Sequence, residues 1–171
     1  HAADGTAIAE APLTVGRAGV NYMDIDTVAA ALREGRTTFG RPVIGKKLGK
    51  PVFGATAPIR DADGKVIGAL AGVTNLGLAN FLDGLTSSSL KNGSYVVLVA
   101  PAQRLIVTST DARRVMESLP APGVNPALDS FVNGREGVDI LQNPGGIEVL
   151  AAVKRIPASG WYVAVARPTA E

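Results

Sequence analysis

The segment PVFGATAPIRDADGKVIGALAGV, residues 51–73, decides the fold. Two runs of strand-like composition flank the residues RDADG, and an Asp-Gly pair between such runs favours a tight turn. The segment therefore predicts an antiparallel hairpin. The chain closes with a similar segment, VLAAVKRIPASGWYVAVAR at 149–167. We therefore expect one supersecondary unit to occur twice.

A helix is predicted before the hairpin, in the segment YMDIDTVAAALREG at 22–35. Ile25, Val28 and Leu32 recur on one helical face. Asp24 is placed to cap the N-terminus, and Gly35 is placed to end the helix.

Three further elements are predicted in the first half. Residues 4–12, DGTAIAEAP, predict a turn and one strand, whose hairpin partner would lie upstream of the chain. Residues 41–45, RPVIG, predict a short strand. From Leu78 the apolar spacing becomes helical, and LKNG at 90–93 would end that helix.

The second half shows the same order of elements. Residues 94–110 predict a hairpin that turns at Pro101 to Gln103, and Asn125 with Pro126 is typical of a helix start. The remaining expected elements are helices within 111–120 and 125–134 and strands at 136–141, 147–156 and 160–168.

This order predicts an α+β fold with two modules, at 1–77 and 78–171. Strands joined by short turns pair antiparallel, and helices between them must bury an apolar stripe. Each module is therefore expected to be an antiparallel sheet of about five strands with helices on one face. The first module would lack its opening strand. The space between sheet and helices is the default place for a ligand.

Composition excludes several classes of protein. The 171 residues are 46% hydrophobic and 19% charged, which is typical of a globular chain. A net charge of +2 and eight aromatic residues (four Phe, three Tyr and one Trp) argue against nucleic acid as a partner. Without cysteine there is no disulfide framework. No apolar run reaches the roughly 18 residues of a membrane span.

Motifs that suggest chemistry are incomplete. GRPVIGKK at 40–47 resembles a phosphate-binding loop but has Lys47 where a hydroxyl is needed. DADG at 61–64 opens like a calcium loop but runs into a strand. The one histidine is His1. We therefore expect no catalytic residue, metal or cofactor, although a hydrolase with two carboxylates from distant segments stays open.

Four residues are candidates for contact with a ligand. Arg41 lies in a basic run, 36–50, that contains no acid, and its guanidinium suits a carboxylate or phosphate. The alternative is a solvated basic loop. Tyr22 could direct a hydroxyl into the pocket or pack its ring against the sheet. Asp24 and Thr56 complete the set.

The chain resembles a double Cache region, the tandem PAS-like sensor of bacterial membrane receptors. The resemblance rests on VNYMDIDTVAAALREGRTTFGRPVIG, PIRDADGKVIGALAGVTNL, YVVLVAPAQRLIVTSTD with RRVMESLPAPGVNP, and LAAVKRIPASGWYVAVARPTAE, in that order. It is nearest to the sensor regions of membrane-bound GGDEF diguanylate cyclases, with histidine kinases and chemoreceptors as other hosts.

The resemblance implies a periplasmic sensor that is not itself an enzyme, in a membrane-anchored parent protein. Residues 1–77 would be the membrane-distal, ligand-binding module, without the family's N-terminal helix and first strand, and 78–171 the membrane-proximal one. It implies a small-molecule ligand, which Arg41 suggests is anionic, and leaves a homodimer open. The alternative is a structural or dimerisation module whose pockets are filled by side chains.

The family's amino-acid signature is not matched. It needs Arg, Trp, Tyr and Asp side chains around the helix and on the following strands. The corresponding positions are Ile25, Thr27, Val28, Val43, Gly45 and Val73. With no carboxylate to meet an α-ammonium group, an amino-acid ligand is not expected.

Overall fold

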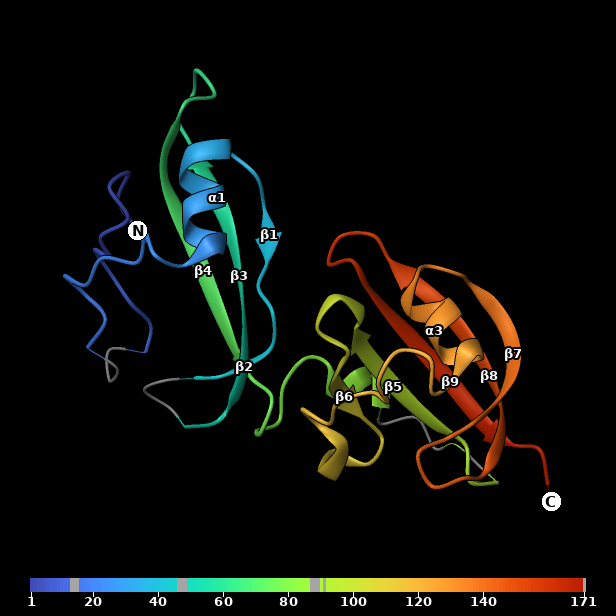
Figure 1. Ribbon diagram of the computed structural model, residues 1–171. Coiled ribbons are helices and arrows are strands. Elements are labelled where there is room, and N and C mark those ends of the chain that lie inside the picture. The colour runs from blue at the N-terminus through green and yellow to red at the C-terminus, as the bar shows by residue number, and fades with distance from the viewer. Residues whose placement is uncertain (13–15, 46–48, 87–89, 91, 171) are drawn as a thin grey trace. The chain divides into compact units, whose positions relative to one another are not determined.

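The computed structural model describes residues 1–12, 16–45, 49–86, 90 and 92–170, which form an α+β fold with two antiparallel sheets (Figure 1). The chain divides into two compact units. The first unit comprises His1–Arg41 and Phe53–Thr74, and the second unit comprises Pro42–Val52 and Asn75–Glu171. The expected division into 1–77 and 78–171 stays a prediction.

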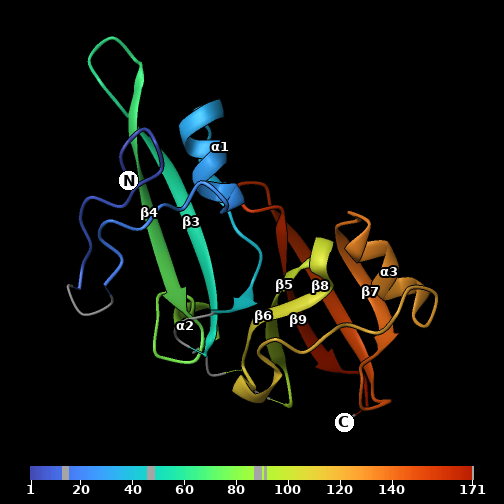
Figure 2. The ribbon, with the colours of Figure 1, turned by 60° about the vertical axis from the view of Figure 1, so that its left-hand side comes forward.

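The first sheet is built around β3 (Pro51–Arg60). Strands β1 (Thr38–Phe39) and β2 (Val43–Ile44) pair with it one after the other, and β4 (Val66–Asn75) pairs with it as well. Figures 1 and 2 show β3 and β4 as a long hairpin that extends beyond α1. The predicted hairpin is confirmed. The sheet has four strands in the described part of the chain, where about five were expected.

The hairpin turn is held by one carboxylate. Asp61 Oδ1 accepts the N–H groups of Asp63 at 3.1 Å and Lys65 at 2.9 Å. Gly64 has a φ of 83°, a conformation that glycine adopts without strain. The side chain of Asp61 thus satisfies backbone donors that a turn leaves free.

Helix α1 (Asp26–Glu34) confirms the predicted helix but not its cap. The N-cap residue is Ile25, and no side chain caps the helix, so the prediction of Asp24 as N-cap is wrong. The helix begins one residue later than expected, and Asp24 stays in the preceding loop, exposed. The buried face consists of Thr27, Val28, Ala30 and Ala31.

The predicted strand at 4–12 is not formed. This segment makes only an isolated bridge, Thr6 with Asn21, and Ala7 exchanges backbone hydrogen bonds with residues 19 and 20. Local pairing therefore takes the place of a sheet partner. Farther upstream, Ala2 makes one bridge to Gly68 of β4.

The second sheet has five strands in the order β6-β5-β9-β8-β7, all antiparallel, as predicted. The strands are β5 (Tyr95–Ala100), β6 (Leu105–Ser109), β7 (Gly137–Gln142), β8 (Glu148–Ile156) and β9 (Trp161–Pro168). A 3-10 turn, η1 (Pro101–Gln103), joins β5 to β6 where the turn was predicted.

Helices of the second unit are shorter than expected. Helix α2 (Asp83–Thr86) begins five residues after Leu78, which is 66% exposed. Its predicted end at 90–93 lies partly outside the described residues. The segment 111–120 holds only the 3-10 turn η2 (Ala112–Arg114). Apolar spacing did not start α2 at Leu78, where Leu78 and Phe81 stay 66% and 72% exposed and bury little surface.

Helix α3 (Pro126–Val132) starts as the sequence indicates. Asn125 accepts the N–H of Leu128 at 3.1 Å, and Pro126 occupies the first turn. Phe131 carries the helix into the core with Val97, Val99, Ile106, Val153, Tyr162 and Ala164. No helix in the described part of the chain is long and apolar enough to cross a membrane.

Replacing Gly35 with Ala is expected to destabilise the first unit. Gly35 ends α1 with a φ of 63°, and its carbonyl accepts a hydrogen bond from Arg60 at 2.9 Å. A Cβ at this position would meet the Arg60 guanidinium, and the alanine would have to adopt a left-handed conformation that L-residues rarely take. We expect a loss of about 1–2 kcal/mol in the free energy of unfolding. Urea unfolding followed by circular dichroism measures it.

The matched control is Gly72→Ala on β4. Gly72 lacks a positive φ, and an added Cβ would find only the Ala55 carbonyl oxygen at 4.0 Å. This variant should unfold like the wild type. Equal losses in both variants would contradict the role assigned to Gly35.

Candidate functional site

The four residues predicted to contact a ligand lie in the first unit. Thr56 is in the middle of β3, 1% exposed, and its hydroxyl donates to the hydroxyl of Thr27 on α1 at 3.1 Å. This bond fixes the start of α1 against the sheet. The Thr56 hydroxyl is thus already engaged with the helix.

Two of the other predicted residues, Asp24 and Arg41, belong to segments that lie near Thr27. Asp24 precedes it by three residues and is exposed. Gly40 precedes Arg41 in the chain. A Cβ added to Gly40 would lie only 3.3 Å from the methyl carbon of Thr27. Arg41 is exposed as well. The structure therefore brings the segments that carry Asp24, Arg41 and Thr56 to the start of α1.

Tyr22 is half-buried against the N-terminus. Its ring meets the ring of His1 edge-on, with centroids 5.2 Å apart. Its backbone N–H donates to Gly5 and its carbonyl accepts from Ile25. The ring thus packs on His1, and its two predicted roles, a hydroxyl in the pocket or a ring against the sheet, stay predictions. No hydrogen bond or ion pair between any two of the four predicted residues is recorded in the described chain.

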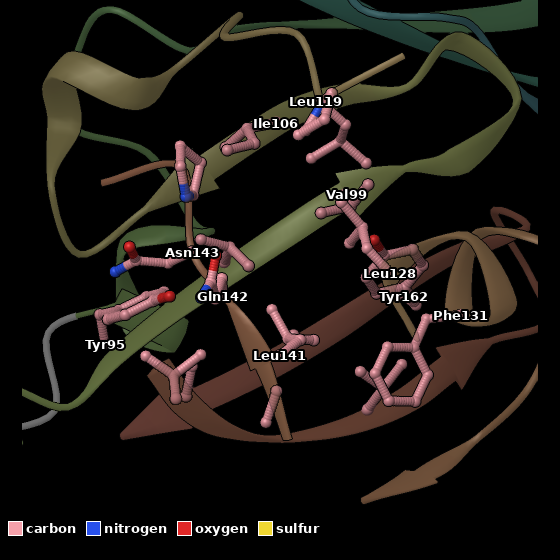
Figure 3. A pocket seen from close by; sticks show the side chains of 18 of the residues that line it. Tyr95, Val99, Ile106, Leu119, Leu128, Phe131, Leu141, Gln142, Asn143 and Tyr162 are labelled. Carbon is pink, nitrogen blue, oxygen red and sulfur yellow. The ribbon is translucent and has the colours of Figure 1, made fainter. Parts of the chain in front are cut away.

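A cavity of about 70 Å³ lies within the second unit (Figure 3). It is bounded by the sheet, by α3 and by the segment around Leu119. Its floor comes from residues of β5, β8 and β9 that share one face of the sheet, because side chains two apart on a strand point the same way. These floor residues are Tyr95, Val97, Val99, Val149, Ala151, Val153, Tyr162, Ala164 and Ala166.

Three alanines make the floor low at its centre. Ala166 stands between Tyr95 on β5 and Ala151 on β8, and Ala164 stands between Val97 and Val153. Small side chains in the middle of the sheet leave space that the surrounding valines cannot fill. The cavity therefore follows from residue size and strand register together.

The roof over this floor is fixed by Arg104. Its guanidinium donates to the Pro120 carbonyl, through Nε at 3.0 Å, and to Asp129 Oδ1 on α3 at 2.8 Å. Asp129 Oδ2 in turn accepts the N–H of Gly123 at 2.7 Å. The loop at 119–123 and helix α3 are thus tied to the β5–β6 turn. This network holds Leu119, Pro120, Leu128 and Phe131 over the sheet.

Tyr162 is the buried polar side chain of the cavity. It is 2% exposed, and burial raises the pKa of its hydroxyl to about 12. This hydroxyl has no protein hydrogen bond among the described residues, where no fully buried side-chain oxygen or nitrogen lacks a partner, so it borders space large enough for water. Figure 3 shows Tyr162 with Leu128 and Phe131 at one end of the cavity.

The opposite end is more polar. Figure 3 places Tyr95, Gln142 and Asn143 there. The Arg114 guanidinium lies 5.8 Å from the centre of the Tyr95 ring, and it makes two bonds to Glu117, at 2.7 and 3.0 Å. These bonds raise the pKa of Arg114. The positive charge of Arg114 is therefore already balanced by Glu117.

Sequence reasoning placed the ligand contacts in the first unit and named none of the cavity residues. A signal was present in the closing hairpin. Alanines occupy alternate positions of β9, at Ala164 and Ala166, and Ala151 faces them from β8. Which face they share with α3 depends on the fold, so the signal alone did not reveal a cavity.

Replacing Asp129 with Asn is expected to reduce the dependence of stability on acid pH. The N–H of Gly123 first, and Arg104 second, lower the pKa of Asp129 below its ordinary value of 3.8. The ionised group therefore stabilises the fold fully above the unfolded pKa, and this contribution disappears as pH falls through the folded pKa. Wild type should exceed D129N in stability at pH 7 and approach it at pH 2.

Urea unfolding between pH 7 and pH 2 measures this difference. Other carboxylates titrate in both proteins, so the gap between the two curves isolates Asp129. A gap that stays constant down to pH 2 would show that the Asp129 charge does not stabilise the roof.

Comparison of the fold with solved structures finds sensor domains. The chain aligns with an extracellular ligand-binding receptor from Desulfohalobium retbaense at 14% identity and a TM-score of 0.71, covering 97% of this chain and 29% of the receptor. The sensor domain of the Vibrio cholerae histidine kinase DctB gives 14% identity and a TM-score of 0.65, over 99% and 70% of the two chains.

A chemoreceptor shows the same fold. The ligand-binding domain of the Pseudomonas aeruginosa amino-acid chemoreceptor PctC, in complex with GABA, is 21% identical with a TM-score of 0.57, over 86% of this chain and 63% of that one. The chain thus spans less than two thirds of two of these three structures. No curated protein matches it in sequence.

The family comparison covers almost the whole sequence. The model dCache_1, described as Cache domain, matches residues 3–171. Both antiparallel sheets lie within this match. The chain belongs to the Cache domain family.

Proposed function

We propose that this chain is the extracytoplasmic sensor region of a bacterial transmembrane signalling protein and binds a small molecule. The observation that carries the proposal is the Cache match over residues 3–171. The structural neighbours named above, a receptor, a kinase sensor domain and a chemoreceptor, support the same class. In this proposal the chain is periplasmic, and any catalysis belongs to other parts of the parent protein.

The output of the parent protein is proposed to be cyclic dinucleotide synthesis. The sequence resemblance to sensor regions of GGDEF diguanylate cyclases supports this host. A histidine kinase or a chemoreceptor is the second candidate, which the fold neighbours favour. The domains outside this chain distinguish the hosts.

The ligand is proposed to bind at the start of α1 in the first unit. Arg41 and Asp24 are exposed there, and no hydrogen bond of either side chain is recorded in the described chain. Arg41 suits a carboxylate or phosphate group, because a guanidinium donates two parallel hydrogen bonds. Tyr22 would add a hydroxyl from the adjoining loop. Thr56 would act through Thr27, by positioning the helix.

An anionic metabolite is the first candidate ligand. An amino acid is the second, because solved neighbours hold asparagine, GABA, L-serine and L-leucine. Asp24 is the acidic side chain among the four candidates and would have to meet the ammonium group. Either ligand would signal only if it binds two arrangements of the protein with different affinity.

Ligand binding should raise the midpoint of thermal unfolding. We suggest screening the chain against short mono- and dicarboxylates, phosphate esters, amino acids, amines and sugars, followed by calorimetry on each compound that stabilises it. A ligand at 100 times its dissociation constant adds about 2.7 kcal/mol to stability. Arg41→Ala should reduce the affinity for an anionic ligand by roughly tenfold or more.

Arg36→Ala is the matched control. Arg36 belongs to the same basic run, but its guanidinium is bonded to Glu34 at 2.7 Å. This variant should keep wild-type affinity. A ligand unaffected by Arg41→Ala would place the site elsewhere, and a screen in which nothing stabilises the chain would overturn the sensor proposal in favour of a structural module.

A further inference from the structure

We propose that the cavity of the second unit is a separate binding site for a small neutral organic molecule, a short-chain ketone or alcohol. Its oxygen would accept a hydrogen bond from the Tyr162 hydroxyl, and its carbon atoms would lie on the alanine floor formed by Ala151, Ala164 and Ala166. This site is independent of the one proposed at Arg41, because all its lining residues belong to the second unit.

The size of the cavity limits the ligand. Its volume is about 70 Å³. An engineered apolar cavity of about 150 Å³ accommodates benzene, with six carbon atoms, and a water molecule takes about 30 Å³. The second-unit cavity therefore holds about three non-hydrogen atoms. Ethanol has this size, 2-propanol and acetone with one more atom are at its upper limit, and amino acids and dicarboxylates exceed it.

The lining favours a neutral molecule. Most of it is aliphatic or aromatic carbon from valine, alanine, leucine and phenylalanine side chains. Arg114, the one cation of the lining, is already paired with Glu117 and lies over Tyr95. An acetate or ammonium ion would lose its hydration without gaining a free partner of opposite charge. A charged ligand is therefore disfavoured in this cavity.

Tyr162 selects for an oxygen atom. A phenol so deeply buried is protonated at neutral pH and offers an O–H donor. With no partner recorded in the described residues, that donor would gain a hydrogen bond from a ketone or alcohol oxygen. A hydrocarbon of equal shape would leave it unpaired, at a cost typical of buried polar groups.

The ligand's small size also limits affinity. Even the most efficient small ligands gain a bounded free energy per atom, so four atoms give a dissociation constant on the order of tens of micromolar at the tightest. Millimolar values are the expected range for a weaker fit. Ligand-observed NMR is suited to both.

The test uses the chain as it stands, with acetone and 2-propanol as probes and saturation-transfer NMR as readout. Both should bind saturably, and acetate should not. Ala151→Val adds two methyl groups to the floor and should weaken binding at least tenfold. Ala152→Val is the matched control, because Ala152 is the next residue of β8, exposed on the other face of the sheet. It should bind like the wild type.

A second variant separates shape from hydrogen bonding. Tyr162→Phe keeps the ring and removes the donor, so acetone should bind about three- to tenfold more weakly, while xenon, detected by its chemical shift, should bind as before. Loss of both probes would indicate a collapsed cavity and overturn the role of Tyr162.

Other outcomes are equally decisive. Absence of saturable binding to the wild-type chain, with water as the only occupant, would overturn the site. So would binding that survives Ala151→Val in a protein whose spectrum shows a native fold. Neither result bears on the first-unit site, which is tested by anions and Arg41.

Discussion

The antiparallel pairing of β9 between β5 and β8 determines the interior of the second unit. Successive side chains of a strand point to opposite faces, so one register decides which residues meet α3 and which meet solvent. In this register Tyr162 is opposite Val99, and Ala164 is opposite Val97 and Val153. A shift by one residue would move every one of them to the other face.

The same register explains why a packed core contains a cavity. Valine, leucine and tyrosine fill the ends of the sheet, whereas three alanines occupy its middle. Interiors are normally packed to the density of organic crystals, so an unfilled volume is costly. The Arg104 network keeps the roof from collapsing onto the alanines, because it ties the loop to α3. The position of this unfilled volume and the free energy that it costs together suggest a binding site.

The first unit is organised by different contacts. Its sheet depends on β3, and α1 is fastened to that strand through the Thr27–Thr56 hydroxyl pair. The helix buries mostly small residues, alanines among them, so it lies close to the sheet. Of the candidate ligand residues, Asp24 and Arg41 are exposed around the helix start, Tyr22 is half-buried and Thr56 is buried. The side chains of Asp24 and Arg41 are available to bind, whereas the candidate residues of the second unit line a small cavity.

Local chemistry in the sequence determined the hairpins, the C-terminal end of α1, the start of α3, and the five strands of the second sheet. Asp-Gly turns, Gly35 and the Asn125-Pro126 pair act on their own neighbours in the chain. Their effect can therefore be predicted from the sequence without knowledge of the fold. Tertiary structure alone decided the lengths of the helices after Leu78 and Asp111, the failure of the strand at 4–12, and the cavity. Each depends on which surfaces meet across the chain, and contacts between distant residues leave no local pattern.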